Sequence, residues 1–279
     1  MTNTTHDEHV APPQAWDAIA AMYDEHVAEG EAELAMAGLR LAGLEPGNTF
    51  VDVCAGTGGL SLPAARMGAK VLATDWAPRM IERFEARAAA EGLDAEGRVM
   101  DCHDLQIADD TYDVAGSQFG VMLVPDQAQA LREMVRVTRP GGRVLLIAYG
   151  DPGEFEALHT FVGAIQAVVP AFEGPGDEPM LEFQVADPAD LRVRLEAAGL
   201  RDVVVDTTNR ERIEVTSGRQ LWDWCLGGNP IPGMLVADLT DEQRADVIEV
   251  LDRMVRERSG GDGPAVLTAP LNIGVGTKP

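Results

Sequence analysis

Basic residues are scarce in this chain of 279 residues. The only lysines are Lys70 and Lys278, and 22 lysines and arginines stand against 46 aspartates and glutamates, a formal net charge of −24. Nucleic acid binding draws its affinity largely from lysine and arginine on phosphates, so this balance argues against RNA, DNA and anionic membranes as partners. A solvated acidic surface is the plain interpretation, and steering of a cationic small molecule is the alternative.

Cysteines and long apolar runs are also few or missing. Cys54, Cys102 and Cys225 are odd in number and lack metal-ligand spacing, so we expect neither a metal nor a disulfide framework. No run of about 18 apolar residues exists, and no membrane span is predicted. The first ten residues lack the basic region and apolar core of a signal peptide, which predicts a cytoplasmic protein.

The apolar content of 46% is ordinary for a globular chain, and apolar segments alternate in type along its first half. The alternation predicts an α/β, doubly wound, mostly parallel sheet whose ligand binds at the carboxyl ends of the strands. The expected strands are about 49–54, 70–74, 96–100, 112–117 and 142–148, and the expected helices are 58–67, 77–91 and 126–137.

The flanks carry other elements. Residues 1–13 are predicted to be disordered, and residues 14–279 to form one domain with a core of about 45–150 plus 187–279. Lid or cap elements are expected at about 14–42, as N-terminal helices, and at 151–186, where a helix precedes a proline/glycine-rich loop. The remaining expected elements are a helix from Asp187 to Ala198, strands 201–207 and 212–216, helices 217–226 and 240–258 (the second capped by Thr240 with Glu242 close behind), and a last strand 271–277.

The segment Phe50–Gly59 (FVDVCAGTGG), followed by Asp75, is the most informative part of the chain. It predicts a buried strand, a tight glycine turn, a helix, and a second strand that ends on an acid. Glycine lets the backbone turn sharply and approach a ligand closely. An acid 19 residues after Gly56 is well placed to accept hydrogen bonds from two ribose hydroxyls.

Two departures separate this segment from the dinucleotide fingerprint. Counted as G-x-G-x-x-G from Gly56, the third position is Ser61 instead of glycine. Asp52 lies on the first strand, where its charge would repel a pyrophosphate. The loop instead suits a nucleoside that carries a positive charge, which favours S-adenosylmethionine over NAD.

Four further motifs follow in order, and with the glycine motif they give the chain a family resemblance. They are LATD at 72–75, VMDCHDL at 99–105, YDVAGSQFG at 112–120 and RPGGRV at 139–144. Together with residues 50–59, these motifs resemble those of the class I S-adenosylmethionine-dependent methyltransferases, broadly the group that includes ubiquinone/menaquinone biosynthesis enzymes. The resemblance implies a Rossmann-like sheet of seven strands and the product S-adenosylhomocysteine.

The resemblance also implies a cofactor site. Asp75 would hold the ribose, with a role at the start of the next helix as the alternative, and Asp101 with the backbone of Cys102 would read the adenine. Trp76 and Met80 would flank the adenine or pack in the core. The other expected cofactor-binding residues are Tyr23, which would cover the cofactor or pack in the core, Asp52, Ala55, Gly56, Gly58, Ser117 and Gln118.

The acceptor site is less well defined by the sequence. Phe119 and Met122 would wall the acceptor pocket or pack in the core. His26 is the candidate general base and His159 could also face the pocket, with a solvated helix face as the alternative for both. Of the tryptophans at 222 and 224, which cannot share one helix face, Trp222 is assigned to the pocket, and packing in the core is the alternative.

The function that these residues predict is methyl transfer to a small-molecule acceptor. A methyltransferase mainly positions its acceptor in line with the methyl carbon and excludes water. The alternatives are an NAD-dependent oxidoreductase and a non-catalytic S-adenosylmethionine-binding protein. The sequence leaves open the acceptor, the atom that is methylated and the oligomeric state.

Overall fold

The computed structural model describes residues 11–174, 180–261 and 263–279. Most of the predicted tail, 1–10, and the end of the predicted lid loop, 175–179, lie outside the described residues, and Pro13 already begins a helix. Among the described helices, none combines the length and the apolar character that crossing a membrane requires.

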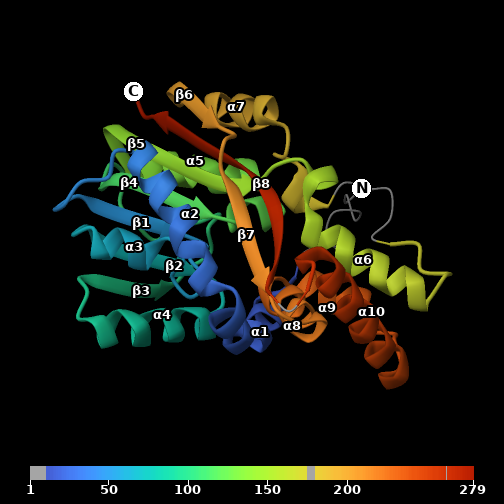
Figure 1. Ribbon diagram of the computed structural model, residues 1–279. Helices are drawn as coiled ribbons and strands as arrows, with labels where there is room; N and C mark the ends of the chain where they lie inside the picture. Colours follow the sequence, from blue (N-terminus) through green and yellow to red (C-terminus); the bar gives the residue numbers. More distant parts are fainter. Residues whose placement is uncertain (1–10, 175–179, 262) are drawn as a thin grey trace, which may run out of the picture.

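A twisted α/β sheet forms the larger part of the molecule (Figure 1). Its strands lie in the order β3-β2-β1-β4-β5-β8-β6, the first five parallel and β8 antiparallel to both of its neighbours β5 and β6. The predicted doubly wound, mostly parallel, seven-stranded sheet is confirmed, and an eighth strand, β7, pairs only with β8. The strands are β1 Thr49–Val53, β2 Lys70–Asp75, β3 Ala95–Val99, β4 Tyr112–Gln118, β5 Thr138–Tyr149, β6 Arg201–Asp206, β7 Arg210–Val215 and β8 Ala265–Thr277.

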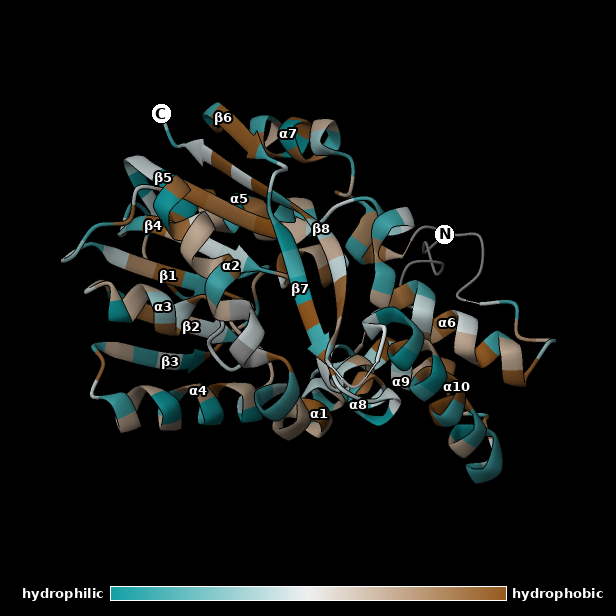
Figure 2. Ribbon diagram, in the orientation of Figure 1, coloured by the Kyte–Doolittle hydropathy of each residue, from teal (hydrophilic) through white to brown (hydrophobic). Residues whose placement is uncertain are grey.

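Helices connect and cover these strands. They are α1 Pro13–His26, α2 Ala28–Leu41, α3 Ser61–Arg66, α4 Pro78–Glu91, α5 Gln127–Val137, α6 Glu156–Val168, α7 Pro188–Ala197, α8 Gly218–Gly228, α9 Pro230–Leu235 and α10 Asp241–Ser259, with single 3₁₀ turns η2 Val121–Leu123, η3 Pro152–Glu154 and η4 Leu181–Phe183. The second half of β5 is strongly apolar, whereas the end of α10 near Ser259 is hydrophilic (Figure 2).

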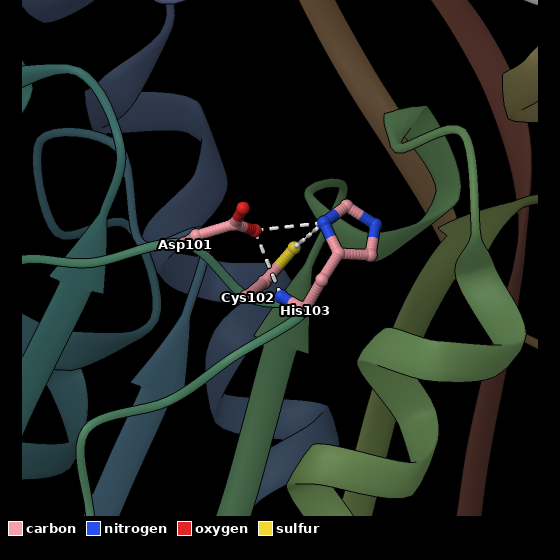
Figure 3. Close-up of side chains that lie close together, drawn as sticks. All are labelled: Asp101, Cys102 and His103. Atoms are coloured by element: carbon pink, nitrogen blue, oxygen red, sulfur yellow. Dashed lines mark hydrogen bonds and ion pairs between the residues drawn. The ribbon is translucent and has the colours of Figure 1, made fainter.

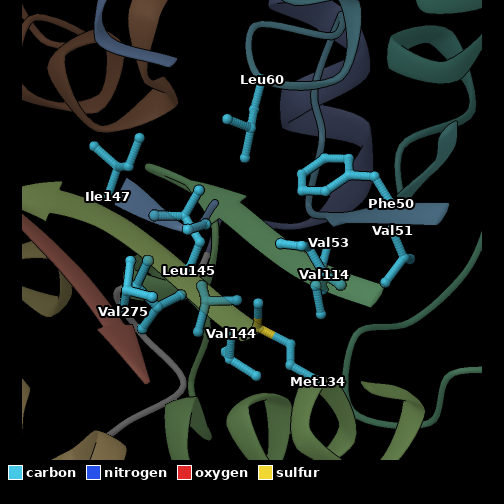
Figure 4. Close-up of a cluster of buried hydrophobic side chains, with 14 of the residues drawn as sticks. Phe50, Val51, Val53, Leu60, Val114, Met134, Val144, Leu145, Ile147 and Val275 are labelled. Carbon is cyan, nitrogen blue, oxygen red and sulfur yellow. The ribbon is translucent and has the colours of Figure 1, made fainter. Parts of the chain in front are cut away.

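Both faces of the central strands are buried. Successive side chains of a strand point to opposite faces, so Val144 and Leu145 of β5 pack into different layers. Leu145 and Ile147 lie under α2, where a Cβ on Gly38 would come within 2.7 Å of Ile147 Cδ1. Met134 of α5 belongs to the opposite layer (Figure 4). Burial on both faces explains why the strands are nearly continuous apolar runs instead of alternating ones.

A second hydrophobic core lies beyond the carboxyl ends of the parallel strands. It is built from α6, α8, α10, β7 and the first half of β8, and includes Phe161, Trp222, Leu251 and Leu267. These elements and α9 gather at one end of the sheet (Figure 1). The cap therefore draws on residues from 210 to 269, which the sequence had placed with the sheet, as well as on residues after 150.

The strand β8 joins the two cores. Its first half pairs with β7, as in Leu267 opposite Ile213, and its second half pairs with β5 and β6, as in Ile273 opposite Ile147. The sequence predicted only the second half, 271–277. Pro270 interrupts the apolar pattern, but a proline is tolerated in a strand where no ladder hydrogen bond needs its missing N–H.

Side chains of the preceding residues stabilise the starts of α7, α9 and α10. The Asp187 carboxylate accepts a hydrogen bond from Ala189 N, as predicted. At Thr240 the capping partner is Gln243 instead of the neighbouring Glu242, because the reciprocal bond needs the third helical residue. The structure adds a helix between the two expected at 217–226 and 240–258: Asn229 caps the short helix α9, which begins at Pro230.

Close packing of α8 on α10 gives a test of the cap. A Cβ on Gly218 would lie 2.2 Å from the backbone nitrogen of Asp252, and backbone cannot move aside cheaply. We expect Gly218→Ala to lower the free energy of unfolding by about 1–3 kcal/mol, measured by urea denaturation. Gly233 in α9 has no atom within 4 Å of its added Cβ. Gly233→Ala is the control and should stabilise by up to about 1 kcal/mol; equal stability of the two variants would contradict the packing.

Candidate functional site

A cavity of about 170 Å³ opens at the carboxyl ends of β1, β2, β4 and β5, between the sheet and the cap. The helix α1, the segment after β3, the turns η2 and η4, and the helices α6, α8 and α9 complete its walls. Of the predicted site residues, those that line it are Tyr23, Asp52, Ala55, Gly56, Asp75, Trp76, Met80, Asp101, Cys102, Gln118, Phe119 and Met122.

The loop after β1 turns through three residues with positive φ. Cys54, Gly56 and Gly58 have φ of 57°, 54° and 99°. A Cβ on Gly56 would point toward the Tyr23 ring at 3.8 Å, whereas one on Gly58 would lie 2.6 Å from the ring of Phe84. Gly56 therefore faces the cavity, and Gly58, which does not line it, permits the loop to pack on α4.

Asp75 joins the ends of β1 and β2. Its Oδ2 accepts a hydrogen bond from Gly56 N at 2.9 Å and its Oδ1 one from Ala77 N at 2.9 Å. Both expected roles are thus compatible, since the carboxylate serves the start of α4 and each oxygen keeps a second lone pair for a ligand. Burial raises the pKa of Asp75 to about 6, against the lowering effect of these backbone hydrogen bonds.

Asp52 presents a buried oxygen that lacks a partner. The side chain is 1% exposed, and Oδ2 accepts a hydrogen bond from the Ser61 hydroxyl at 2.6 Å. Within the described part of the chain, Oδ1 has no hydrogen-bond partner. Burial raises the pKa of Asp52 to about 7, and the nearby Asp75 adds to the shift. A cationic ligand in the cavity would compensate the buried negative charge of Asp52 and its unpartnered oxygen. The residues present therefore fit S-adenosylmethionine.

The helix α1 covers this part of the cavity. Tyr23 lies over Gly56, and Trp16 adds to the same wall. Ion pairs fasten α1 to α4: Asp24 binds Arg83 at 3.1 Å and Arg87 at 2.9 Å. These contacts explain how a helix outside the sheet holds an aromatic ring against the glycine loop.

Asp101, Cys102 and His103 form a compact turn after β3 (Figure 3). Asp101 Oδ1 accepts a hydrogen bond from His103 N at 2.8 Å and lies 2.7 Å from His103 Nδ1. Possible metal-ligand atoms of the three residues lie within 4.8 Å of one another. Asp101 Oδ1 and His103 Nδ1 already bind each other, however. The contact between His103 and Asp101 therefore accounts for the cluster, and the absence of a metal stays a prediction.

Four other predicted residues lie outside the lining of the cavity. His26 is half-buried on α1. His159 is exposed and its Nε2 lies 3.0 Å from the Pro152 carbonyl. Trp222 packs on Phe161 in the second core, with ring centroids 5.6 Å apart. The Ser117 hydroxyl accepts a hydrogen bond from Val121 N at 3.1 Å, and thus shapes the turn after β4.

An aromatic stack that the sequence did not predict forms one wall. Tyr149 lies between Phe119 and Phe155, with ring centroids 4.6 Å from each. Its hydroxyl donates to Glu211 Oε2 at 3.0 Å, and burial raises the pKa of Glu211 to about 7. Of the two tryptophans at 222 and 224, the one that lines the cavity is Trp224. The Trp-x-Trp pattern indicated that the two rings point in different directions from the helix. Which of the two rings faces the cavity is decided by how α8 packs.

Comparison with known proteins agrees with this geometry. Residues 50–142 match the family described as "Methyltransferase domain". An uncharacterized protein of Mycobacterium tuberculosis is 44% identical over 114 residues, 41% of this chain and 42% of that protein. The ubiquinone/menaquinone biosynthesis C-methyltransferase of Bdellovibrio bacteriovorus is 34% identical over 141 residues, 49% of this chain and 59% of that enzyme. The chain thus spans about half the length of the curated relatives that it matches.

Solved structures give the same fold. The YcgJ protein of Bacillus subtilis has a TM-score of 0.56 at 14% identity, covering 88% of this chain and 97% of that one. Phosphoethanolamine N-methyltransferase 2 of Haemonchus contortus, in complex with S-adenosylmethionine, has a TM-score of 0.54 at 16% identity, covering 88% of this chain and 52% of that one. Residues 50–142 of the chain thus match the methyltransferase domain family, and the chain shares the fold of these solved structures.

The pKa of Asp52 predicts a dependence of stability on pH. Because the folded protein binds this proton more tightly than the unfolded chain, whose pKa is 3.8, its contribution is present below about pH 4 and is lost as the pH rises through about 7. In Asp52→Asn, the fall in unfolding free energy between pH 4 and 8 should be smaller, by up to about 4 kcal/mol.

The measurement is urea unfolding of the cofactor-free protein at several pH values. Asp246→Asn, at an exposed position of α10, is the control and should follow the wild-type curve. Parallel curves for Asp52→Asn and the wild type would mean that Asp52 is already solvated.

Proposed function

We propose that the protein transfers a methyl group from S-adenosylmethionine to a small-molecule acceptor by in-line displacement, with S-adenosylhomocysteine as the product. The observation that carries the proposal is the pairing of Asp75 with Gly56 at the ends of β1 and β2, beside the unpartnered Oδ1 of Asp52. This arrangement offers acceptors for two hydroxyls and a negative site for a cation at the ends of two neighbouring strands. It also lies inside the matching segment 50–142.

The cofactor supplies an electrophilic methyl carbon on a sulfonium, so the chain's task is to position the acceptor in line with that carbon and to exclude water. Asp75 would hold the ribose hydroxyls, and Asp52 would balance the positive charge. Asp101 has a free carboxylate oxygen for the adenine amine, beside Trp76 and Met80 on the cavity wall. Tyr23 would close the loop from the α1 side.

The acceptor would lie on the other side of Gln118, against the stack of Phe119, Tyr149 and Phe155. The enclosed cavity fits a small molecule better than a polymer. The formal charge of −24 supports the same choice, because it disfavours nucleic acid and anionic membranes, and we retain the cytoplasm as the proposed location. The oligomeric state is left open.

Binding of S-adenosylhomocysteine tests the cofactor site. We expect isothermal titration calorimetry to give one site per chain, and Asp75→Asn to weaken binding at least about tenfold through loss of a charge-assisted hydrogen bond. Asp104→Asn, on the exposed side of the adjacent turn, is the matched control and should bind like the wild type. Circular dichroism should show that each variant is folded.

Two outcomes would contradict the assignment. Unchanged affinity in a folded Asp75→Asn protein would remove the ribose role, and binding of NAD in place of S-adenosylhomocysteine would favour an oxidoreductase. Transfer of label from methyl-labelled S-adenosylmethionine to a low-molecular-weight extract then distinguishes an enzyme from a protein that only binds the cofactor.

A further inference from the structure

A second buried carboxylate with an unpartnered oxygen, Glu182, lines the cavity apart from the three aspartates of the cofactor side. The side chain is 7% exposed, and within the described residues its Oε2 has no hydrogen-bond partner. Burying an unpaired carboxylate costs several kcal/mol, and the chain could avoid this with an apolar residue. A buried carboxylate with an unpartnered oxygen inside a cavity therefore indicates a ligand-binding role.

Glu182 lies on the acceptor side. Its turn η4 contacts η2, after β4, and the strand β5. Asp75 ends β2, and the order β2-β1-β4-β5 separates those strand ends by three spacings, about 14 Å. A ribose at Asp75 is therefore out of reach of Glu182, whereas a molecule held against Tyr149, at the end of β5, is close to it.

The backbone around Glu182 is held by buried side chains. Gln127 Nε2 donates to the Leu181 carbonyl at 3.1 Å, and Arg194 in turn donates to Gln127 Oε1 at 2.7 Å. Asn272 Nδ2 donates to the carbonyls of Val185 and Ala186 at 3.1 and 2.7 Å. Three side chains from α5, α7 and β8 thus fix η4 and the segment that leads to α7, so the position of the carboxylate is built into the fold.

The surroundings of Glu182 define the chemistry of its partner. Among the described residues that line the cavity there is no lysine or arginine, and the acidic members are Asp52, Asp75, Asp101 and Glu182. The one histidine of this lining, His103, is paired with Asp101 in the turn after β3. Apolar and aromatic side chains form most of the remaining wall around η4, including Phe183 and Trp224. An anion would find no counter-charge here, whereas a cation would meet both a carboxylate and aromatic ring faces.

We propose that Glu182 binds a cationic amine on a flat, otherwise apolar methyl acceptor. The inference rests on the proposed function, since it places the acceptor beside the S-adenosylmethionine site. Glu182 acts in recognition: its Oε2 accepts an N–H hydrogen bond from the ammonium, and the aromatic wall holds the apolar body. Burial raises the pKa of Glu182, and the cation reverses this effect by pairing with the carboxylate.

The test uses three probes that share an indole ring and differ in charge: tryptamine, tryptophol and indole-3-acetate. Their dissociation constants are measured by calorimetry on the wild-type protein saturated with S-adenosylhomocysteine. We expect tryptamine to bind at least about tenfold more tightly than indole-3-acetate, with tryptophol between them. In Glu182→Gln this preference should shrink to about threefold or less, while affinity for S-adenosylhomocysteine stays unchanged.

Two controls sharpen the result. Glu196→Gln removes the same charge from the exposed face of α7 and should keep the wild-type preference. The thermal unfolding temperature of ligand-free Glu182→Gln should equal or exceed that of the wild type, because the substitution removes an unpaired buried charge. If the carboxylate had a purely structural role, the substitution would lower the unfolding temperature.

The inference is overturned if no probe with an ammonium binds, if indole-3-acetate binds as well as tryptamine, or if Glu182→Gln keeps the full preference. Titration of S-adenosylhomocysteine alone separates this failure from failure of the proposed function. Normal cofactor binding without a cation preference removes only the role of Glu182, whereas absence of cofactor binding removes both.

Discussion

The hydrogen bonds that the Asp75 carboxylate accepts from Gly56 N and Ala77 N are the interaction on which the site depends. They place one buried negative charge where the loop after β1 meets the start of α4. Without it, two backbone N–H groups would lose their partners and the glycine loop would lose its anchor. The same carboxylate keeps lone pairs that face the cavity, so the group that anchors the loop is also available to a ligand.

The cavity concentrates acidic groups at a cost in stability. Asp52 and Asp75 have pKa values raised by burial, and on the far side Glu182 and Glu211 are raised for the same reason. Glu211 holds the Tyr149 hydroxyl, so it supports the aromatic wall from behind. Such a site gains stability from positively charged ligands, which fits a sulfonium cofactor on one side and an ammonium on the other.

The cap is more than a lid inserted after β5. It has its own hydrophobic core, and β8 crosses from that core into the sheet, so the two share one continuous strand. Ion pairs of Asp24 with Arg83 and Arg87 fasten α1 to α4, and α1 also packs against the cap helix α8. The cavity is thus enclosed by elements from both ends of the chain, which brings Tyr23 and Trp224 to the same space.

The sequence by itself determined the sheet and most of the residues that line the cavity at the ends of β1 and β2. Apolar runs, glycines with a required positive φ and an acid at a strand end act locally, so Gly56 and Asp75 could be identified from their spacing along the chain. Helix caps such as Asp187 could be predicted for the same reason. Tyr23, Asp101 and Gln118 also line the cavity, because the strands and helices that position them have a clear apolar pattern in the sequence.

Only the tertiary structure decided the other side of the cavity, where the acceptor is proposed to lie. Trp224 instead of Trp222, the stack at Tyr149, and Glu182 depend on how α8, β5 and η4 pack against elements far away in the sequence. His26 and His159 have suitable chemistry but lie outside the cavity lining, since helix rotation and not residue type sets their direction. Burial of a carboxylate without a partner leaves no trace in the local sequence, because it arises from the sum of contacts that surround it.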